Sequence, residues 1–276
     1  MSANSIELVK PWTSDLLSSL PGVTHAITYR VAGMGRADGN IGFGAPRDRA
    51  DAWEMRQAWC NAASLDSQRL VTLGQVHGST VHIAKAAHAG WGATPGSQQI
   101  GFGDALATEE VGPVLLSLHA DCQPIIFIDP GTRQHGPRIA VAHAGWRGTV
   151  ADVAGATLGA MATAFNTRVE DVHVALGPGI GGCCYDVGED VATAWRTRAG
   201  VDAHDALVPF DDRFRFSLTA ANTHLLTRSG VRPEHIETAD ICTRCQGDHW
   251  FSHRGQGALT GRFGAMIALH HGGAMK

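Results

Sequence analysis

The sequence has no apolar run long enough to cross a bilayer. The longest runs, VLLSL and IIFI, cover residues 114–118 and 125–128, whereas a membrane-spanning helix needs about 20 apolar residues. The sequence also has no cluster of Lys and Arg, and its formal net charge is -4. Because nucleic-acid-binding proteins usually carry a basic face, these absences argue against nucleic-acid and membrane partners and favour a small molecule.

The N-terminal residues of this sequence do not predict an export signal. The first residues, MSANSIELVKPWTSDLL, contain no basic stretch followed by an apolar core, so we expect a cytoplasmic protein. In a large chain without such a signal, cysteines are better interpreted as thiols, ligands or core residues than as a disulfide framework. The six cysteines are Cys60, Cys122, Cys183, Cys184, Cys242 and Cys245.

Low-complexity linkers, internal repeats and abrupt changes in composition are missing as well. The 276 residues are 44% hydrophobic and 17% charged, which is an ordinary globular mixture. We therefore expect a single domain over residues 1–276. Apolar runs of strand length alternate with helical patterns, and this alternation predicts a mixed α/β (α+β) fold.

Capping residues and apolar periodicity predict the individual elements. Thr149 is expected to begin a helix, with Asp152 completing a capping box, and Ser217 is expected to cap a helix over 218–229. Residues 264–270 are expected to form a last helix or strand pair. The other expected strands are 23–29, 70–76, 80–84, 114–118, 125–128 and 139–142, and the other expected helices are 47–63 and 188–197.

Three polar motifs stand where apolar strands end: QVHGS around His77, HADCQP around Cys122 and AHAGWRG around His143. Loops at strand ends can direct side chains into a shared cleft. Two imidazoles and one thiolate suit zinc, and three protein ligands leave a fourth position open, as in catalytic zinc sites. The spacing is long and irregular, and a lone His at a strand end is more often a satisfied polar residue, as a lone Cys is more often part of the core packing.

Longer motifs sharpen this interpretation, because they occur together and in one order along most of the chain. This combination resembles the multicopper-polyphenol-oxidase, or laccase-domain, family of bacterial YfiH/YlmD-type proteins. The matching stretches are QVHG (75–78), GDALAT (103–108), ADCQPI (120–125), VAHAGWRGT (141–149), GPGIGGCCYDVG (177–188), DICTRC (240–245) and TGR (260–262).

The resemblance implies a YfiH/CNF-like fold, with mixed β-sheets covered by helices. It implies zinc on His77, Cys122 and His143, phosphorolysis of purine nucleosides such as adenosine, inosine and guanosine, and deamination of adenosine. The family's FFSYRRDG stretch is WFSHRGQG here, so His253 stands at the tyrosine position. The substrate contacts implied or expected are Arg30, Asn40 and Gln75.

Two further residues are candidates for catalysis by position. Arg147 follows His143 within the AHAGWRG motif and precedes an expected helix start, where a guanidinium and free N–H groups would hold phosphate. The equal alternative is an ordinary arginine at the surface or at the edge of the core. Asp121, beside Cys122, is the candidate general acid or base. The glycines of GPGIGGCC are interpreted as permitting a tight turn, with Cys183 and Cys184 packed beneath it.

A second metal group is a rival hypothesis. Cys242, Cys245, His249 and His253 form C-x2-C-x3-H-x3-H, although the gap between the Cys pair and the first His is much shorter than in an ordinary zinc finger. We interpret this group mainly as structural or substrate-lining.

Three other functions remain open from the sequence. A copper-dependent polyphenol oxidase needs clustered His-x-His pairs, and none occurs among the 15 histidines, although copper is an alternative occupant of a His/Cys site. Cys122 would otherwise be a metal-free nucleophile with His143 as its base. The last alternative is a non-catalytic module that binds zinc or nucleosides.

Overall fold

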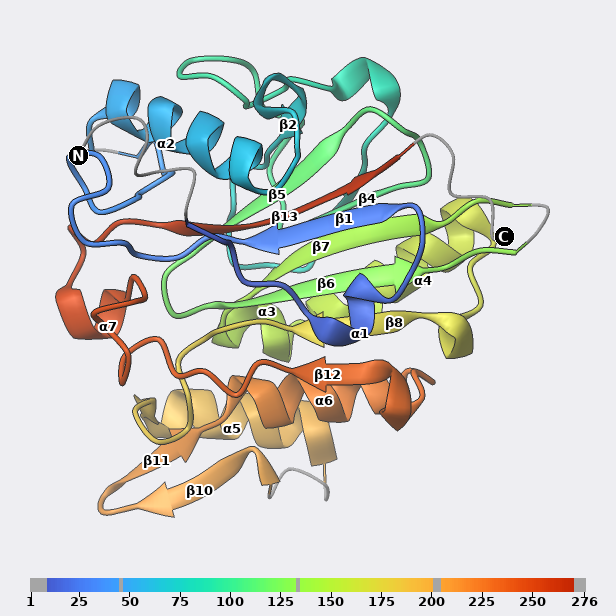
Figure 1. Cartoon of the computed structure of the whole chain (residues 1–276). Helices are drawn as coiled ribbons and strands as arrows, with labels where there is room; N and C mark the ends of the chain where they lie inside the picture. The colour runs from blue at the N-terminus through green and yellow to red at the C-terminus, as the bar shows by residue number, and fades with distance from the viewer. Residues whose placement is uncertain (1–8, 45–46, 133–134, 201–204, 271–276) are drawn as a thin grey trace.

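Two β-sheets packed face to face form the centre of the computed structural model (Figure 1). The structure describes residues 9–44, 47–132, 135–200 and 205–270. The first eight residues, which contributed to the expectation about export, lie outside the described residues.

The smaller of these two sheets has the strand order β1-β13-β5-β2. Its strands are β1 (Val23–Ile27), β13 (Phe263–Leu269), β5 (Val114–His119) and β2 (Leu70–Val71). Strand β13, from the end of the described chain, pairs antiparallel with both β1 and β5. The first and last of the described strands are therefore neighbours.

The larger sheet has the order β12-β8-β6-β7-β4-β3 and mixes parallel with antiparallel pairs. Strands β6 and β7 are buried along their whole lengths at its centre. The strands are β3 (Val81–Ile83), β4 (Ala105–Thr108), β6 (Gln123–Asp129), β7 (Arg138–Ala144), β8 (His173–Leu176) and β12 (Ile236–Thr238).

Alternating side chains build three cores around these sheets, because successive residues of a strand face opposite sides. Ile126 of the larger sheet packs with Leu115 of the smaller one in the core between them. Helix α4 (Val153–Phe165) covers the outer face of the larger sheet, and α2 (Arg49–Ala62) covers that of the smaller sheet. Figure 1 shows α2 lying across β5 and β13.

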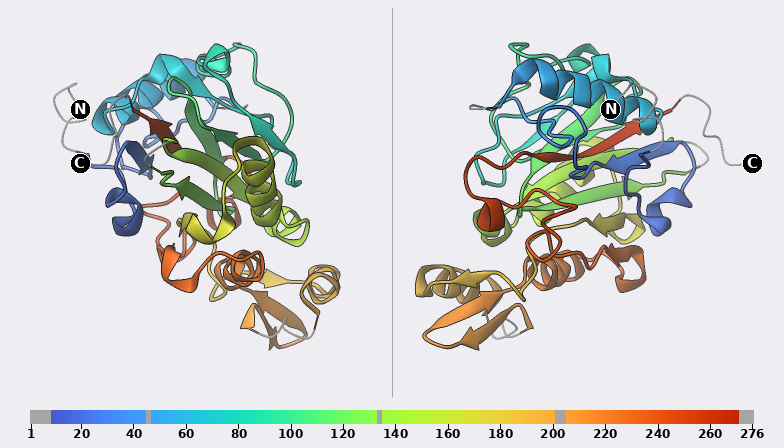
Figure 2. Two further views of the ribbon diagram at one scale, coloured as in Figure 1. Left: turned by 90° about the vertical axis from the view of Figure 1, so that its right-hand side faces the viewer. Right: turned by 60° about the vertical axis from the view of Figure 1, so that its left-hand side comes forward.

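A lobe with its own core extends beyond the larger sheet, as both views in Figure 2 show. Trp195 and Phe216 are completely buried in it. Its elements are β9 (Asp186–Val187), α5 (Glu189–Ala199), β10 (Leu207–Phe210), β11 (Arg213–Phe216) and α6 (Leu218–Arg228). The remaining short helices are α1 (Asp15–Ser18), α3 (Trp146–Val150) and α7 (His253–Gln256).

The prediction of mixed sheets covered by helices is confirmed, and Ser217 caps α6 by accepting the Ala220 N–H. The expected cap at Thr149 is wrong. Thr149 lies inside α3, and Asp152 is the N-cap of α4, with its carboxylate accepting the Gly155 N–H. The expected strand 70–76 is limited to β2, and residues 264–270 contribute one strand, β13, rather than a helix or a strand pair.

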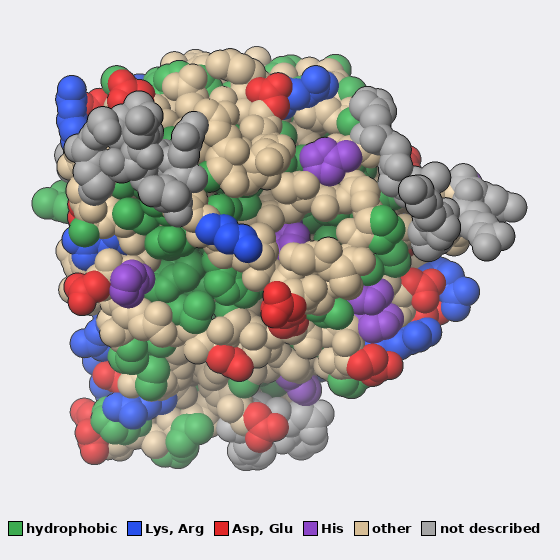
Figure 3. All heavy atoms as spheres, viewed as in Figure 1, with side chains coloured by type: hydrophobic (Ala, Val, Ile, Leu, Met, Phe, Trp, Pro, Cys, Tyr) green, Lys and Arg blue, Asp and Glu red, His purple; other side chains and the backbone are tan. Residues whose placement is uncertain are grey.

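No helix within the described ranges is long and apolar enough to cross a membrane. The face drawn in Figure 3 mixes acidic, basic and apolar side chains without an extended patch of one charge.

Candidate active site and metal centre

Three separate segments bring His77, Cys122 and His143 together. His77 lies in the loop between β2 and β3, Cys122 in the turn between β5 and β6, and His143 near the end of β7. One ligand atom from each lies within 4.8 Å of the others, and the two imidazole rings meet edge to face. This donor set, two nitrogens and one sulfur, suits a borderline-soft metal ion.

The Asp104 carboxylate fixes both histidine segments. Its Oδ1 accepts the ring Nδ1–H of His143 and the backbone N–H of His77, each at 2.9 Å, and its Oδ2 accepts the Gly78 N–H at 2.6 Å. With Nδ1 occupied in this way, Nε2 is the nitrogen of His143 that is free to bind a metal. Such carboxylate–histidine contacts orient metal ligands and increase their basicity.

The half-buried Cys122 thiol and the buried His143 imidazole favour opposite charges on each other. Burial alone would raise the pKa of Cys122, but the His143 and His77 rings outweigh it and lower that pKa to about 6. Burial would likewise lower the pKa of His143, but the Cys122 thiolate and the Asp104 carboxylate raise it to about 9. The site therefore stabilises a thiolate, which is the form that binds metals and acts as a nucleophile.

Unusual backbone conformations hold this centre in place. His77 and Asp121 have φ angles of 62° and 80°, which are uncommon for residues with side chains and often mark functional sites. A Cβ at Gly145 would lie 2.7 Å from the Cys122 sulfur and 3.2 Å from Cδ2 of His77. Gly145 is therefore needed for the close approach of the chain to the ligand atoms.

A cavity of about 650 Å³ opens over the three candidate ligands, within the range typical of small-molecule sites. Among the described lining residues, Asp121 supplies the acidic side chain, whereas the basic ones are Arg47, Arg147, Arg254 and Arg262. Burial lowers the pKa of Arg262, and the nearby positive charge of Arg47 lowers it further. A bound anion would relieve this repulsion, so the cavity favours anionic groups.

A family model described as multi-copper polyphenol oxidoreductase laccase matches residues 24–270. The chain belongs to this family. The match covers both sheets and the lobe, and includes all three candidate metal ligands.

Individual members of this family are similar over most of the chain. Purine nucleoside phosphorylase YlmD of Geobacillus stearothermophilus is 32% identical over 232 residues, 83% of this chain and 82% of that protein. The crystal structure of YlmD from the same organism matches with a TM-score of 0.85 and 30% identity, over 91% of this chain and 93% of that one. Adenosine deaminase RL5, from an unknown prokaryotic organism, is 35% identical over 161 residues, 58% of this chain and 59% of that protein.

Among the other residues expected at the site, Gln75, Asp121 and Arg147 line the cavity. The Gln75 side-chain amide exchanges two hydrogen bonds with the Leu118 backbone. Asp121 accepts the Thr243 hydroxyl at 2.7 Å and the Arg254 backbone N–H at 2.6 Å. The catalytic and substrate roles assigned to these three residues stay predictions.

Arg147 places a cationic group at the cavity without a competing protein acceptor. Its guanidinium lies 4.4 Å from the centre of the Trp146 ring, and it makes no hydrogen bond or ion pair with the described part of the chain. The helix that it was expected to precede is only the five-residue α3, which contains it. The guanidinium itself is therefore the feature that would bind an anion.

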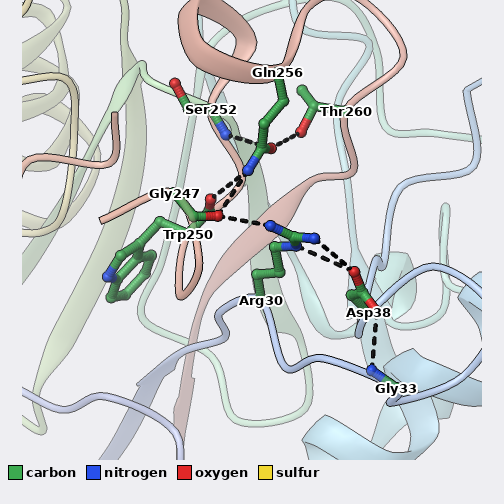
Figure 4. Close-up of polar contacts among 8 residues, drawn as sticks. All are labelled: Arg30, Gly33, Asp38, Gly247, Trp250, Ser252, Gln256 and Thr260. Carbon is green, nitrogen blue, oxygen red and sulfur yellow. Dashed lines mark hydrogen bonds and ion pairs between the residues drawn. The ribbon is translucent and has the colours of Figure 1, made fainter. Parts of the chain in front are cut away.

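Arg30 and Asn40 do not line the cavity in the described structure. Figure 4 shows Arg30 between Asp38 and the Gly247 carbonyl, to which it donates at 2.9 and 2.8 Å. The buried Asn40 accepts the backbone N–H of Arg262, which does line the cavity. Both side chains are occupied by these structural contacts, and their expected role in substrate binding stays untested.

Several cavity and supporting residues had no assigned role in the sequence analysis. Asp104 and Arg262 lie in the GDALAT and TGR motifs, and membership of these motifs was a sign that both residues matter. Neither motif, however, shows which residues Asp104 and Arg262 contact in space. Arg47 and Tyr185 reach the cavity from distant segments. His119, in the HADC motif, is fully buried and bonds through Nδ1 to the Cys122 carbonyl, so it supports the turn.

The structure does not group Cys242 and Cys245 with His249 and His253, which was the rival hypothesis from the sequence. The partners of these cysteines are Cys183 and Cys184, with all four sulfurs within 4.8 Å. Cys183 is exposed, so it is not packed beneath the glycine turn as expected. His253 instead lines the cavity.

Proposed function

We propose that the protein is a zinc-dependent purine nucleoside phosphorylase that also deaminates adenosine. The observation that carries this proposal is the His77–Cys122–His143 group at an arginine-lined cavity. The names of the similar proteins, a purine nucleoside phosphorylase and an adenosine deaminase, point to the same two reactions. The expected location in the cytoplasm belongs to the same proposal.

The residues fit zinc on their own chemistry. His143 is oriented by Asp104, Cys122 is held as a thiolate, and Gly145 leaves space beside both Cys122 and His77. A zinc ion held by these three ligands would lower the pKa of water in its open position and polarise a bound substrate. Copper is the alternative occupant, because it exceeds zinc in intrinsic affinity for such ligands.

Phosphorolysis requires phosphate to reach the anomeric carbon of the ribose while its charge is held by cations. Arg147 is the best placed of the cavity arginines, because its donors have no acceptor among the described residues. Arg47 and Arg262, which also line the cavity, add further positive charge. These side chains would bind and orient phosphate, and would favour negative charge on the departing purine.

Deamination at the purine C6 needs a group that moves protons between water and the leaving amine. Asp121 borders the cavity next to Cys122, and both of its carboxylate oxygens accept hydrogen bonds from neighbouring segments. These contacts fix the direction of the carboxylate. We propose Asp121 as this acid and base, with Gln75 as a substrate contact nearby.

Polyphenol oxidation is the weaker alternative. Reducing oxygen to water needs four electrons and therefore several redox centres. The described His-containing group has three ligands, which suffice for one metal ion.

A metal-free nucleophile is the other alternative, because the lowered pKa of Cys122 also suits that role. The metal content of active protein distinguishes these alternatives.

The decisive experiment is chromatography of products from adenosine, with and without phosphate, on one zinc-loaded preparation, beside oxygen uptake on a phenol. Adenine and ribose 1-phosphate should form only with phosphate, and inosine should form in both conditions. His77→Ala should abolish both reactions, whereas the exposed control His135→Ala should not. Oxygen uptake without nucleoside turnover would overturn the proposal, and inactivity in both assays would favour a binding module.

A further inference from the structure

Four cysteine thiols from two distant loops converge at one point outside the active-site cavity. Cys183 and Cys184 follow the glycine turn after β8, and Cys242 and Cys245 follow β12. The Cys245 sulfur lies 3.5 Å from that of Cys183 and 3.3 Å from that of Cys184. All four sulfurs lie within 4.8 Å of one another.

These distances match the requirements of a tetrahedral metal site. Zinc–thiolate bonds are about 2.3 Å long, so the sulfurs of a ZnS4 tetrahedron are about 3.8 Å apart. These two sulfur–sulfur separations lie just below this value, as expected of ligands that surround one central point. A disulfide would instead bring two sulfurs to about 2.05 Å and leave the other two thiols without a role, whereas all four cysteines here are free thiols.

The surrounding backbone favours negative charge on at least one sulfur. The Gly181 N–H donates to the sulfur of Cys242 at 3.3 Å. Such N–H contacts stabilise thiolates, which are the form that binds zinc. A Cβ at Gly181 would lie 3.1 Å from the Cys183 sulfur and from the Cys242 Cβ, so the glycine lets the two loops approach.

We infer that Cys183, Cys184, Cys242 and Cys245 bind a structural zinc ion, distinct from the proposed catalytic one. Four thiolates in a tetrahedral arrangement select zinc over harder divalent ions, and a closed set of four protein ligands is the pattern of structural sites. Binding releases the protons of those cysteines that are thiols to solvent and involves no change in oxidation state.

The consequence of this second site concerns the wall of the active-site cavity. Ile180 and Tyr185, which line the cavity, flank the cysteine pair of the first loop. In the second loop, Thr243 donates its hydroxyl to Asp121, directly beside Cys122. One ion would therefore fix two loops that border the site, in addition to the backbone bonds between Gly179 and both Ile241 and Thr243.

Metal analysis of the full-length protein tests this inference. Wild-type protein should contain two zinc ions per chain. Cys245→Ser, which changes an exposed ligand, should contain one, as should Cys122→Ser, and the double variant should contain none. If Cys245→Ser keeps as much zinc as wild type, the inference is overturned, whereas loss of zinc only in Cys122→Ser would leave the catalytic proposal standing alone.

Cobalt substitution identifies the site without relying on stoichiometry. Sulfur-to-cobalt charge-transfer absorption scales with the number of thiolate ligands, so cobalt in Cys122→Ser should absorb about four times as strongly as cobalt in Cys245→Ser. Equal weak absorption in both variants would contradict a four-thiolate site. Chelation should also lower the melting temperature of Cys122→Ser but not that of the double variant.

A thiol-reactivity measurement on wild-type protein avoids any effect of substitution on folding. Zinc should protect Cys183, Cys184, Cys242 and Cys245 from a thiol reagent, and a chelator should expose them together. Chelator-independent reactivity would overturn the inference. A loss of two mass units under non-reducing conditions, with one disulfide in this cluster and no zinc, would also overturn it.

Discussion

Replacing Asp104 by Asn tests how the metal centre is held in place. The carboxylate is buried, and it accepts hydrogen bonds from the His143 ring and from the backbone N–H groups of His77, Gly78 and Val76. Burial alone would raise its pKa, but the His143 ring and the Gly78 N–H outweigh it and lower that pKa. Asp104 is therefore a carboxylate at neutral pH.

Asn has nearly the same shape but no charge, and its NH2 group cannot accept a hydrogen bond. If the new NH2 group faces Gly78, it takes the place of Oδ2, which now accepts the Gly78 N–H at 2.6 Å. Two hydrogen-bond donors would then face each other. If it faces His143, the ring loses the acceptor that fixes its orientation. Losing such a supporting contact typically costs about 10- to 100-fold in metal affinity, or about 1.4–2.8 kcal/mol.

Competition with a chromophoric chelator should show this loss of affinity in Asp104→Asn, together with a decrease in nucleoside turnover. Asp129→Asn is the matched control, because Asp129 is also a buried carboxylate but lies at the opposite end of β6 from Cys122. Unchanged zinc affinity in a folded Asp104→Asn variant would refute the reasoning. Equal losses in both variants would indicate a general effect on stability instead.

Three other perturbations have defined outcomes. Arg147→Ala should reduce phosphorolysis about tenfold more than deamination, since only phosphorolysis uses phosphate; equal losses in product assays would contradict this role. Gly145→Ala should lower zinc affinity about tenfold or more in the chelator assay, because the new methyl group would meet the Cys122 sulfur. Burial lowers the pKa of His25 to about 4 from 6.5, so its contribution to stability is complete above pH 6.5 and is lost as the pH falls towards 4. Between pH 7 and pH 5, urea unfolding should show a loss about 2 kcal/mol larger in wild type than in His25→Gln, and equal losses would show that His25 is not the responsible group.

The candidate metal ligands could be named from the sequence because each one stands in a polar motif and because these motifs together resemble one family. His77, Cys122 and His143 all lie in polar motifs that follow or end apolar runs, and the structure places their ligand atoms within 4.8 Å. The mixed class and most of the long elements followed from periodicity in the same way. These features depend on residues that are close together in the chain.

Features that depend on distant partners could not be predicted in this way. Cys242 and Cys245 lie with the cysteine pair about 60 residues earlier, whereas the local C-x2-C-x3-H-x3-H spacing pointed only to the nearer histidines as a rival metal group. Thr149 and Asp152 both have side chains that can cap a helix. Because Thr149 lies inside the separate short helix α3, Asp152 is the residue that caps α4. Arg30 shows the same limit, because nothing near it in the chain indicates its contact with the Gly247 carbonyl.

The position of β13 has a consequence for biosynthesis. Val23 of β1 pairs with Leu269, so the described strand that the ribosome makes last lies between β1 and β5 rather than at an edge. Until β13 is released, both neighbouring strands have unpaired backbone groups, and the apolar face of α2 has an incomplete surface to cover. Nascent chains with such exposed edges are prone to aggregate. The growing polypeptide should therefore depend on chaperones until β13 is made, and a premature stop codon before Phe263 should yield insoluble protein even though all three candidate metal ligands have been translated.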